Sequence, residues 1–179
     1  MRLTSKEAAY TSVSAALIYI GTSIAIPMPK PLGVWHFGDI FTFIVCILFG
    51  PIVGGFASGI GPMLFDVWNP FWGSAFIVYA PATLVIRGIM GVILGSLRTV
   101  FRGHVYVSEV FAMAVAVSVK NFGYFFYDYY LYGAVAFLDL VTFFPMSALF
   151  VAITIPILAT VRKVLGVQYL IQPSAKRGN

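Results

Sequence analysis

Long uncharged apolar stretches dominate this sequence and limit what it can fold into. Four of them stand out, at 8–29, 40–65, 67–86 and 140–161, and a fifth, 105–127, is interrupted only by Glu109 and Lys120. With 60% hydrophobic and 9% charged residues, the chain has too few charged side chains to cover a soluble domain of its size. The sequence therefore predicts an all-α membrane protein that forms one domain over residues 1–179.

A pair of turn-forming residues divides one of these stretches. A helix that crosses the bilayer core needs roughly 20 apolar residues. The second stretch contains Gly50-Pro51, where proline cannot donate a backbone hydrogen bond and glycine permits a sharp reversal. We therefore expect a compact bundle of six transmembrane helices, at 6–26, 39–49, 51–67, 77–97, 106–127 and 137–163.

Basic residues gather on one side of this predicted bundle. If the first helix starts inside, only Lys30 lies outside, and the inner side holds Arg2, Lys6, Arg98, Arg102, Arg162, Lys163, Lys176 and Arg177. By the positive-inside rule both termini are cytoplasmic, and we expect the residues after Gly166 to form a short solvated end. The net charge of +5 then reports orientation in the lipid bilayer and not a nucleic-acid partner.

Two basic residues lie where charge is expensive. Arg87 falls about ten residues into the fourth predicted helix, and Lys120, followed by Asn121, lies well inside the fifth. One interpretation is an internal pocket in which these side chains contact a ligand, since guanidinium, ammonium and amide groups suit a carboxylate or a heterocycle. The alternative for Arg87 is a structural ion pair with Asp139 or Asp66.

Three carboxylates accompany these cations. Asp39 either caps the helix that begins beside it or contacts a ligand. Asp66 precedes Trp68-Asn69-Pro70, which ends the third helix at the outer surface. Asp139, early in the sixth helix, is the best candidate to balance Lys120 or to meet a ligand donor.

Aromatic residues crowd the outer end of the fifth helix and the outer loops. An interfacial belt explains most of the aromatic segment 122–132, but Tyr124 and Tyr127 share a helix face with Lys120 and could stack on a ligand. Trp35, His36 and Trp72 occupy outer loops, where they either anchor in lipid headgroups or form a lid over the pocket. His104 falls on the opposite side from His36, so we expect no shared metal site.

The segment 37–95 reads FGDIFTFIVCILFGPIVGGFASGIGPMLFDVWNP and then YAPATLVIRGIMGVILG. It closely resembles the substrate-binding S components of energy-coupling factor (ECF) vitamin transporters, particularly the riboflavin-type and related branches. The resemblance implies a prokaryotic cell-membrane protein that binds a water-soluble vitamin without a cofactor. It also implies docking onto a membrane T component that carries two cytoplasmic ATPases. No phosphate-binding loop occurs in this chain, so ATP hydrolysis is expected in the partners.

Small residues recur at helical spacing in two places. Gly50, Gly54, Gly55 and Gly59, and separately Gly91 and Gly95, are typical of close helix packing in lipid. In the first helix the stripe of Ala8, Ser12 and Ala16 matches a position where the family contacts its membrane partner, with packing inside the bundle as the alternative.

The likeness favours riboflavin among several possible vitamins. The alternative function is a proton-coupled secondary transporter that uses Asp39, Asp66 or Asp139. An enzyme is not expected, because the sequence lacks H-E-x-x-H and G-x-S-x-G motifs and its acidic residues are scattered singly.

Overall fold

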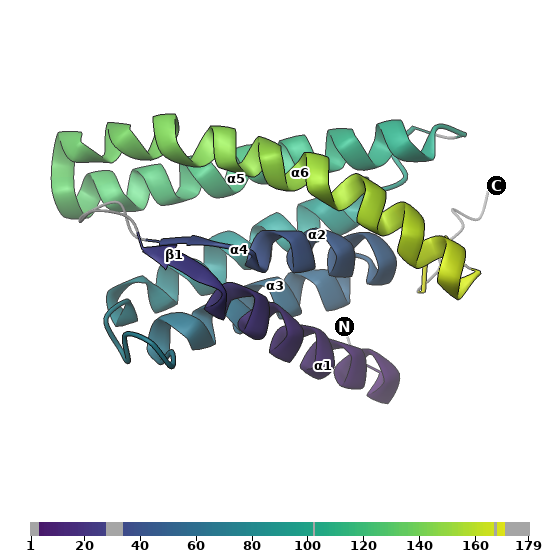
Figure 1. The fold of residues 1–179 in the computed structure, drawn as a ribbon, viewed down its shortest axis with the longest axis horizontal. Coiled ribbons are helices and arrows are strands. Elements are labelled where there is room, and N and C mark those ends of the chain that lie inside the picture. The colour runs from purple at the N-terminus through teal and green to yellow at the C-terminus, as the bar shows by residue number, and fades with distance from the viewer. Residues whose placement is uncertain (1–3, 28–33, 102, 167, 171–179) are drawn as a thin grey trace.

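The computed structural model describes residues 4–27, 34–101, 103–166 and 168–170, and these residues are almost entirely helical (Figure 1). The α-helices are α1 (Ser5–Ser23), α2 (Gly38–Phe49), α3 (Pro51–Val67), α4 (Ala80–Leu97), α5 (Val105–Tyr132) and α6 (Phe137–Leu165). Two short 3₁₀ helices, η1 (Ile77–Tyr79) and η2 (Gly133–Ala136), lead into α4 and α6. The strands β1 (Ala25–Pro27) and β2 (Val34–His36) form an antiparallel hairpin between α1 and α2.

Local sequence signals explain where several helices begin and end. Thr4 and Glu7 form a reciprocal capping box at the start of α1, in which each side chain accepts a hydrogen bond from the other residue's backbone N–H. Gly50 ends α2 with φ +86° and Pro51 is the first residue of α3, which confirms the predicted division at this pair.

Close approach of α3 and α4 depends on glycine. A Cβ atom at Gly91 would lie 2.5 Å from the Gly54 carbonyl oxygen, and one at Gly95 would lie 2.5 Å from the backbone of Gly50 and Pro51. These distances are too short for any side chain, so the two helices pack backbone to backbone along this line. The glycine spacing seen in the sequence therefore corresponds to close packing of α3 against α4 inside the bundle.

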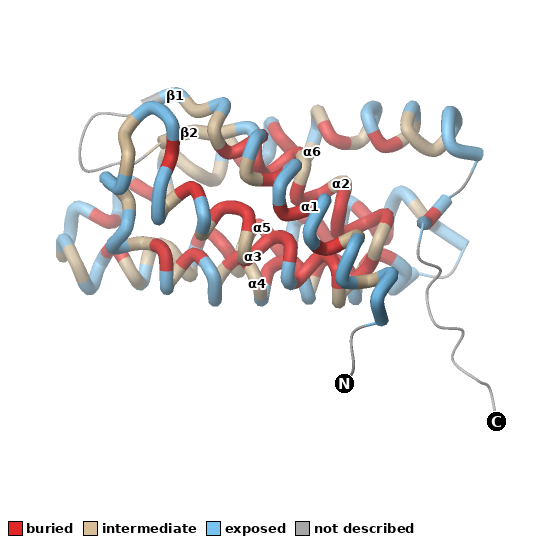
Figure 2. Tube along the Cα trace, turned by 90° about the horizontal axis from the view of Figure 1, so that it is seen from below, coloured by how far each residue is buried: buried red, intermediate tan, exposed pale blue. Residues whose placement is uncertain are grey.

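The helices form two groups that meet along the middle of the bundle. Figure 1 shows α5 and α6 side by side along one edge, with α1 to α4 grouped below them. Buried residues concentrate where the groups meet, and the outer faces of α1 and α6 are largely exposed (Figure 2). Large apolar side chains occupy those outer faces, including Val13 (71% exposed) and Val141 (74% exposed). An apolar exterior of this kind is expected of helices that face lipid.

The expectation of six separate transmembrane passes is met only in part. Because η2 joins α5 to α6, the helical residues run without a break from Val105 to Leu165, which leaves five uninterrupted helical runs in the described residues. Two of these, Ile77–Leu97 and Val105–Leu165, are long and apolar enough to cross a membrane. The helices α2 and α3 are apolar but shorter.

The expectation of a solvated end after Gly166 is wrong at Tyr169, whereas Gln168 and Leu170 are exposed and residues 171–179 lie outside the described part of the chain. Tyr169 is only 6% exposed, and its ring centroid lies 4.7 Å from the guanidinium carbon of Arg98 and 5.7 Å from that of Arg162. The Leu170 N–H donates to the Leu48 carbonyl oxygen at 2.9 Å. Stacking of an aromatic ring on guanidinium groups is favourable, and it holds this segment against the bundle.

The α3–α4 contact can be tested with two alanine substitutions on one helix. Gly91→Ala should destabilise the protein by about 1–3 kcal/mol, because its new Cβ atom would overlap the Gly54 carbonyl oxygen. Gly88→Ala is the matched control, since the nearest atom to its Cβ would be 3.7 Å away. Thermal unfolding in detergent should show a lowered midpoint for Gly91→Ala alone, and equal midpoints for the two variants would contradict the packing described.

Candidate functional site

A buried carboxylate on α2 bridges the two cations that the sequence places at membrane depth. Asp39 Oδ1 lies 2.5 Å from Arg87 Nη2, and Asp39 Oδ2 lies 2.5 Å from Lys120 Nζ. The side chains of Asp39, Arg87 and Lys120 are 4%, 2% and 8% exposed. The cluster therefore joins α2, α4 and α5 through charge-assisted hydrogen bonds away from solvent.

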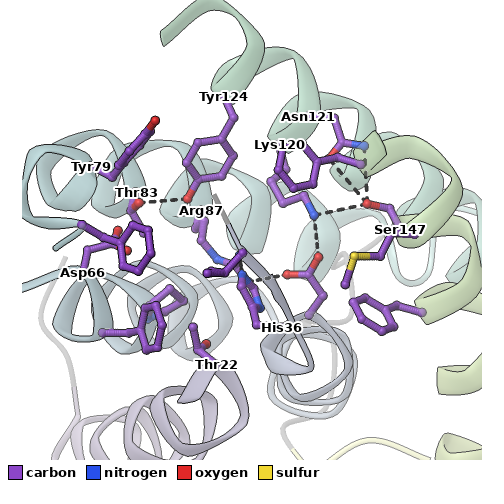
Figure 3. A pocket seen from close by; sticks show the side chains of 18 residues that line it. Thr22, His36, Asp66, Tyr79, Thr83, Arg87, Lys120, Asn121, Tyr124 and Ser147 are labelled. Atoms are coloured by element: carbon purple, nitrogen blue, oxygen red, sulfur yellow. Dashed lines mark hydrogen bonds and ion pairs between the residues drawn. The ribbon is translucent and has the colours of Figure 1, made fainter. Parts of the chain in front are cut away.

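A fourth helix joins this cluster through a hydroxyl group. Lys120 Nζ donates to Ser147 Oγ of α6 at 3.2 Å, and Asn121 Nδ2 lies 3.4 Å from the same oxygen. Figure 3 shows Lys120 and Asn121 pointing from α5 toward Ser147. Polar contacts thus link α2, α4, α5 and α6.

These polar groups line one side of a cavity near the end of the bundle that carries the hairpin. The cavity has a volume of about 110 Å³. Its polar lining consists of Thr22, His36, Asp39, Asp66, Tyr79, Thr83, Arg87, Lys120, Asn121, Tyr124 and Ser147. Its apolar lining consists of Val34, Pro62, Phe65, Phe76, Phe143, Met146 and Phe150. Although many of these residues are polar, apolar atoms contribute most of the cavity surface. An apolar cavity into which polar groups converge is the usual form of a small-molecule site.

The hairpin contributes an imidazole to this site. His36 Nε2 lies 3.5 Å from Arg87 Nη1. Burial, together with the positive charge of Arg87, lowers the pKa of His36 to about 3, so its ring is neutral at physiological pH. A neutral ring beside a guanidinium avoids a third positive charge in the cavity.

Tyr124 lies on the opposite side of Arg87 from the hairpin. Its hydroxyl donates to Thr83 Oγ1 at 2.9 Å, and both residues line the cavity (Figure 3). Thr83 precedes Arg87 by four residues on α4, so the two side chains share a helix face. This contact fixes the tyrosine ring as part of the cavity wall.

Six of the residues proposed from sequence are brought together here: His36, Asp39, Arg87, Lys120, Asn121 and Tyr124. Trp35, Trp72, Tyr127 and Asp139 do not line the cavity. Trp72 packs against the rings of Phe65 and Phe76, and the Tyr127 hydroxyl donates to the Val78 carbonyl oxygen at 2.6 Å. The ligand contacts proposed for all ten residues stay predictions.

Two expected pairings are wrong. Lys120 pairs with Asp39 and not with Asp139, which lies about 12 Å along α6 from Ser147 at 1.5 Å per residue. Arg87 likewise pairs with Asp39 and not with Asp139 or Asp66. Asp39 makes no capping bond at the start of α2, because its carboxylate turns into the bundle to meet the two cations.

Sequence reasoning missed Ser147 and the apolar residues of α6 that line the cavity. Phe143, Met146, Ser147 and Phe150 recur at spacings of three and four, which places them on one helix face. A lone serine within that apolar helix was the available signal. Thr83, one turn before Arg87, could have been found in the same way.

An all-helical bundle with an apolar exterior and a buried polar cavity defines a membrane protein that binds a small molecule. Residues 2–168 match the family model for the S component of the ECF-type riboflavin transporter, so the chain belongs to this family. It is therefore a membrane-embedded, substrate-binding subunit for vitamin uptake and not an enzyme.

A relative from Pyrococcus woesei, named "Uncharacterized protein in gap 3′region", is 42% identical over 113 residues. The match covers 62% of this chain and 69% of the relative. Because that name states no ligand, the functional assignment rests on the family match.

The central ion cluster predicts an asymmetric response to mutation. Asp39→Asn should destabilise the protein by about 3–5 kcal/mol, because Arg87 and Lys120 would then lie buried without a counter-charge. Lys120→Met should cost less, since Asp39 keeps Arg87 as its partner. Adding Lys120→Met to Asp39→Asn should recover part of the loss, as measured by unfolding in detergent. Additive losses in the double variant would show that the two side chains do not interact.

Proposed function

We propose that this protein binds riboflavin from outside the cell and supplies it to an ATP-driven ECF transporter. In this proposal, six helices cross a prokaryotic cell membrane with both termini in the cytoplasm. A membrane T component and two cytoplasmic ATPases complete the transporter. The observation that carries the proposal is a cavity that combines aromatic walls with buried polar groups, in a chain of the riboflavin-transporter S-component family.

The position of the cavity supports the proposed orientation. It lies toward the end of the bundle that carries the hairpin, and Figure 1 shows the start of α1 and the end of α6 at the opposite end. Basic residues such as Lys6, Arg162 and Lys163 lie toward that opposite end, which the positive-inside rule makes cytoplasmic. The cavity then faces the outside, where a scarce vitamin has to be captured.

Binding a vitamin requires the cavity walls to separate. Pockets that hold drug-sized ligands typically measure about 300–1,000 Å³, which exceeds the 110 Å³ found here. We expect the hairpin and the outer half of α6 to move, because Pro145 cannot donate the backbone hydrogen bond that would stiffen α6 beside Met146 and Ser147. Closure over the ligand then commits the protein to docking and to reorientation in the membrane.

The outer surface of α1 supports the proposed docking. Ala8, Ser12 and Ala16 are all exposed, so the stripe faces away from the bundle and is free to meet a partner helix. Ser12 and Ala16 also line a shallow apolar groove between α1 and α3. Small residues at this spacing permit a second helix to approach closely in lipid.

Riboflavin binding by the purified protein is the direct test. The protein alone, in detergent and without ATP or an ion gradient, should quench riboflavin fluorescence at a saturable site. Lys120→Ala should weaken binding about tenfold or more, which corresponds to about 1.4 kcal/mol, because it removes a cation from the cavity wall. Lys163→Ala is the matched control, since Lys163 is exposed near the end of α6.

Proton-coupled transport would replace this proposed function if two results were obtained together. The protein would bind no vitamin, with or without the partner proteins, and solute flux would follow a proton gradient. Unchanged riboflavin affinity in a folded Lys120→Ala protein would instead remove Lys120 from the site while leaving the function in place.

The α1 surface predicts a separation between binding and transport. Ala16→Leu should reduce assembly with the T component and ATPases, measured by co-purification, while riboflavin binding stays unchanged. Leu17→Ala exchanges the same two residue types at another exposed position of α1, about 100° or more around the helix from each residue of the stripe, and should leave assembly intact. Equal assembly of both variants would place the docking surface elsewhere.

A further inference from the structure

Three residues that line the cavity have a buried side-chain atom without a hydrogen-bond partner among the described residues: His36 (Nδ1), Asp66 (Oδ2) and Arg87 (Nε). Of these, Arg87 Nε is a donor and Asp66 Oδ2 is an acceptor when ionised. Both residues line the same cavity, and Figure 3 shows Asp66 and Arg87 on adjacent parts of its wall. Buried polar groups are nearly always hydrogen-bonded, so this pair calls for a ligand that supplies one acceptor and one donor.

The Arg87 donor is held in place by its other contacts. Its Nη2 is bound by Asp39 at 2.5 Å and lies 3.4 Å from Thr42 Oγ1, and its Nη1 lies 3.5 Å from His36 Nε2. A planar guanidinium fixed at both terminal nitrogens has a fixed Nε–H direction. This donor is therefore preorganised before any ligand arrives.

Charge in the cavity disfavours ionic ligands of either sign. A carboxylate ligand would gain from Arg87 but would be repelled by Asp66, and an ammonium ligand would meet the reverse situation. Asp39 and an ionised Asp66 together balance the positive charges of Arg87 and Lys120. An uncharged group that carries a carbonyl oxygen beside an N–H satisfies both protein atoms without either penalty.

The apolar walls favour a flat ring. Phe65 and Phe76 line the cavity and stack with ring centroids 6.0 Å apart and planes 16° apart. Phe150 and Tyr124 line other parts of the wall. Aromatic walls of this kind suit a planar ligand, whose polar edge then meets Arg87 and Asp66.

We propose that Arg87 and Asp66 together recognise the lactam edge, C=O beside N–H, of an uncharged planar heterocycle. The carbonyl oxygen accepts from Arg87 Nε and the ring N–H donates to the Asp66 carboxylate. This inference rests on the proposed function, since riboflavin carries such an edge on its pyrimidinedione ring, and it identifies the chemical group that sets specificity at the same site.

Methylation of the ring nitrogen tests the inference. 3-Methylriboflavin lacks the donor, so it should bind the unmodified protein ten- to a hundredfold more weakly than riboflavin. In Asp66→Ala the acceptor is gone, and the two flavins should bind with nearly equal affinity. Asp128→Asn is the control: Asp128 lies outside the cavity lining and accepts from Tyr79, a bond that Asn can keep. This variant should retain the full methylation effect.

The outcomes separate this inference from the proposed function. If riboflavin binds but methylation has no effect, or if the effect persists in a folded Asp66→Ala protein, the lactam assignment is wrong and riboflavin uptake stands. If riboflavin does not bind, lumazine and 1,3-dimethyllumazine, which has no ring N–H, provide the second comparison. Selective binding of lumazine would retain the lactam assignment with a different vitamin, and binding of neither would overturn both proposals.

Discussion

The Asp39 carboxylate, held between Arg87 and Lys120, is the interaction on which the rest of the site depends. A charged side chain at the centre of a membrane helix costs about 3 kcal/mol on insertion scales, so each of these cations needs a partner. One carboxylate serves both, because it has two oxygens. Since the three residues come from α2, α4 and α5, their pairing sets how these helices are rotated about their axes. That rotation determines which neighbouring side chains line the cavity.

The glycine contact between α3 and α4 works together with the ion cluster. Backbone contact at Gly54 and Gly91 brings α3 close to α4, and this places Asp66 of α3 on the same cavity as Arg87 of α4. A bulkier pair of residues would separate the two helices and their polar groups. The small residues and the buried charges are therefore parts of one arrangement, in which packing supplies the distance and ion pairing supplies the orientation.

Helix positions were predictable from sequence, whereas pairing between helices was not. The Gly50-Pro51 reversal is a local signal, and α3 was predicted with its observed bounds. The expense of intramembrane charge likewise singled out Arg87 and Lys120. The partner of those cations depends on how distant helices rotate and pack, which one sequence does not encode locally. The predicted partners were therefore Asp139 for Lys120 and Asp139 or Asp66 for Arg87, in place of Asp39. The burial of Tyr169 was not predicted for the same reason, because its ring contacts Arg98 and Arg162 on other segments.

The two ends of the bundle differ in how firmly their helices are joined. At the end opposite the hairpin, Arg162 makes two hydrogen bonds to the Glu109 carboxylate, and Arg98 donates to the Ile47 carbonyl oxygen at 2.6 Å. These contacts tie α6 to α5 and α4 to α2. Toward the hairpin, the same helices surround a cavity, and α6 carries Pro145 beside it. Structural change on ligand binding should therefore concentrate at the hairpin end, while the opposite end keeps the helices together as one body. The proposed reorientation of the protein as one unit around a bound vitamin requires both properties at once.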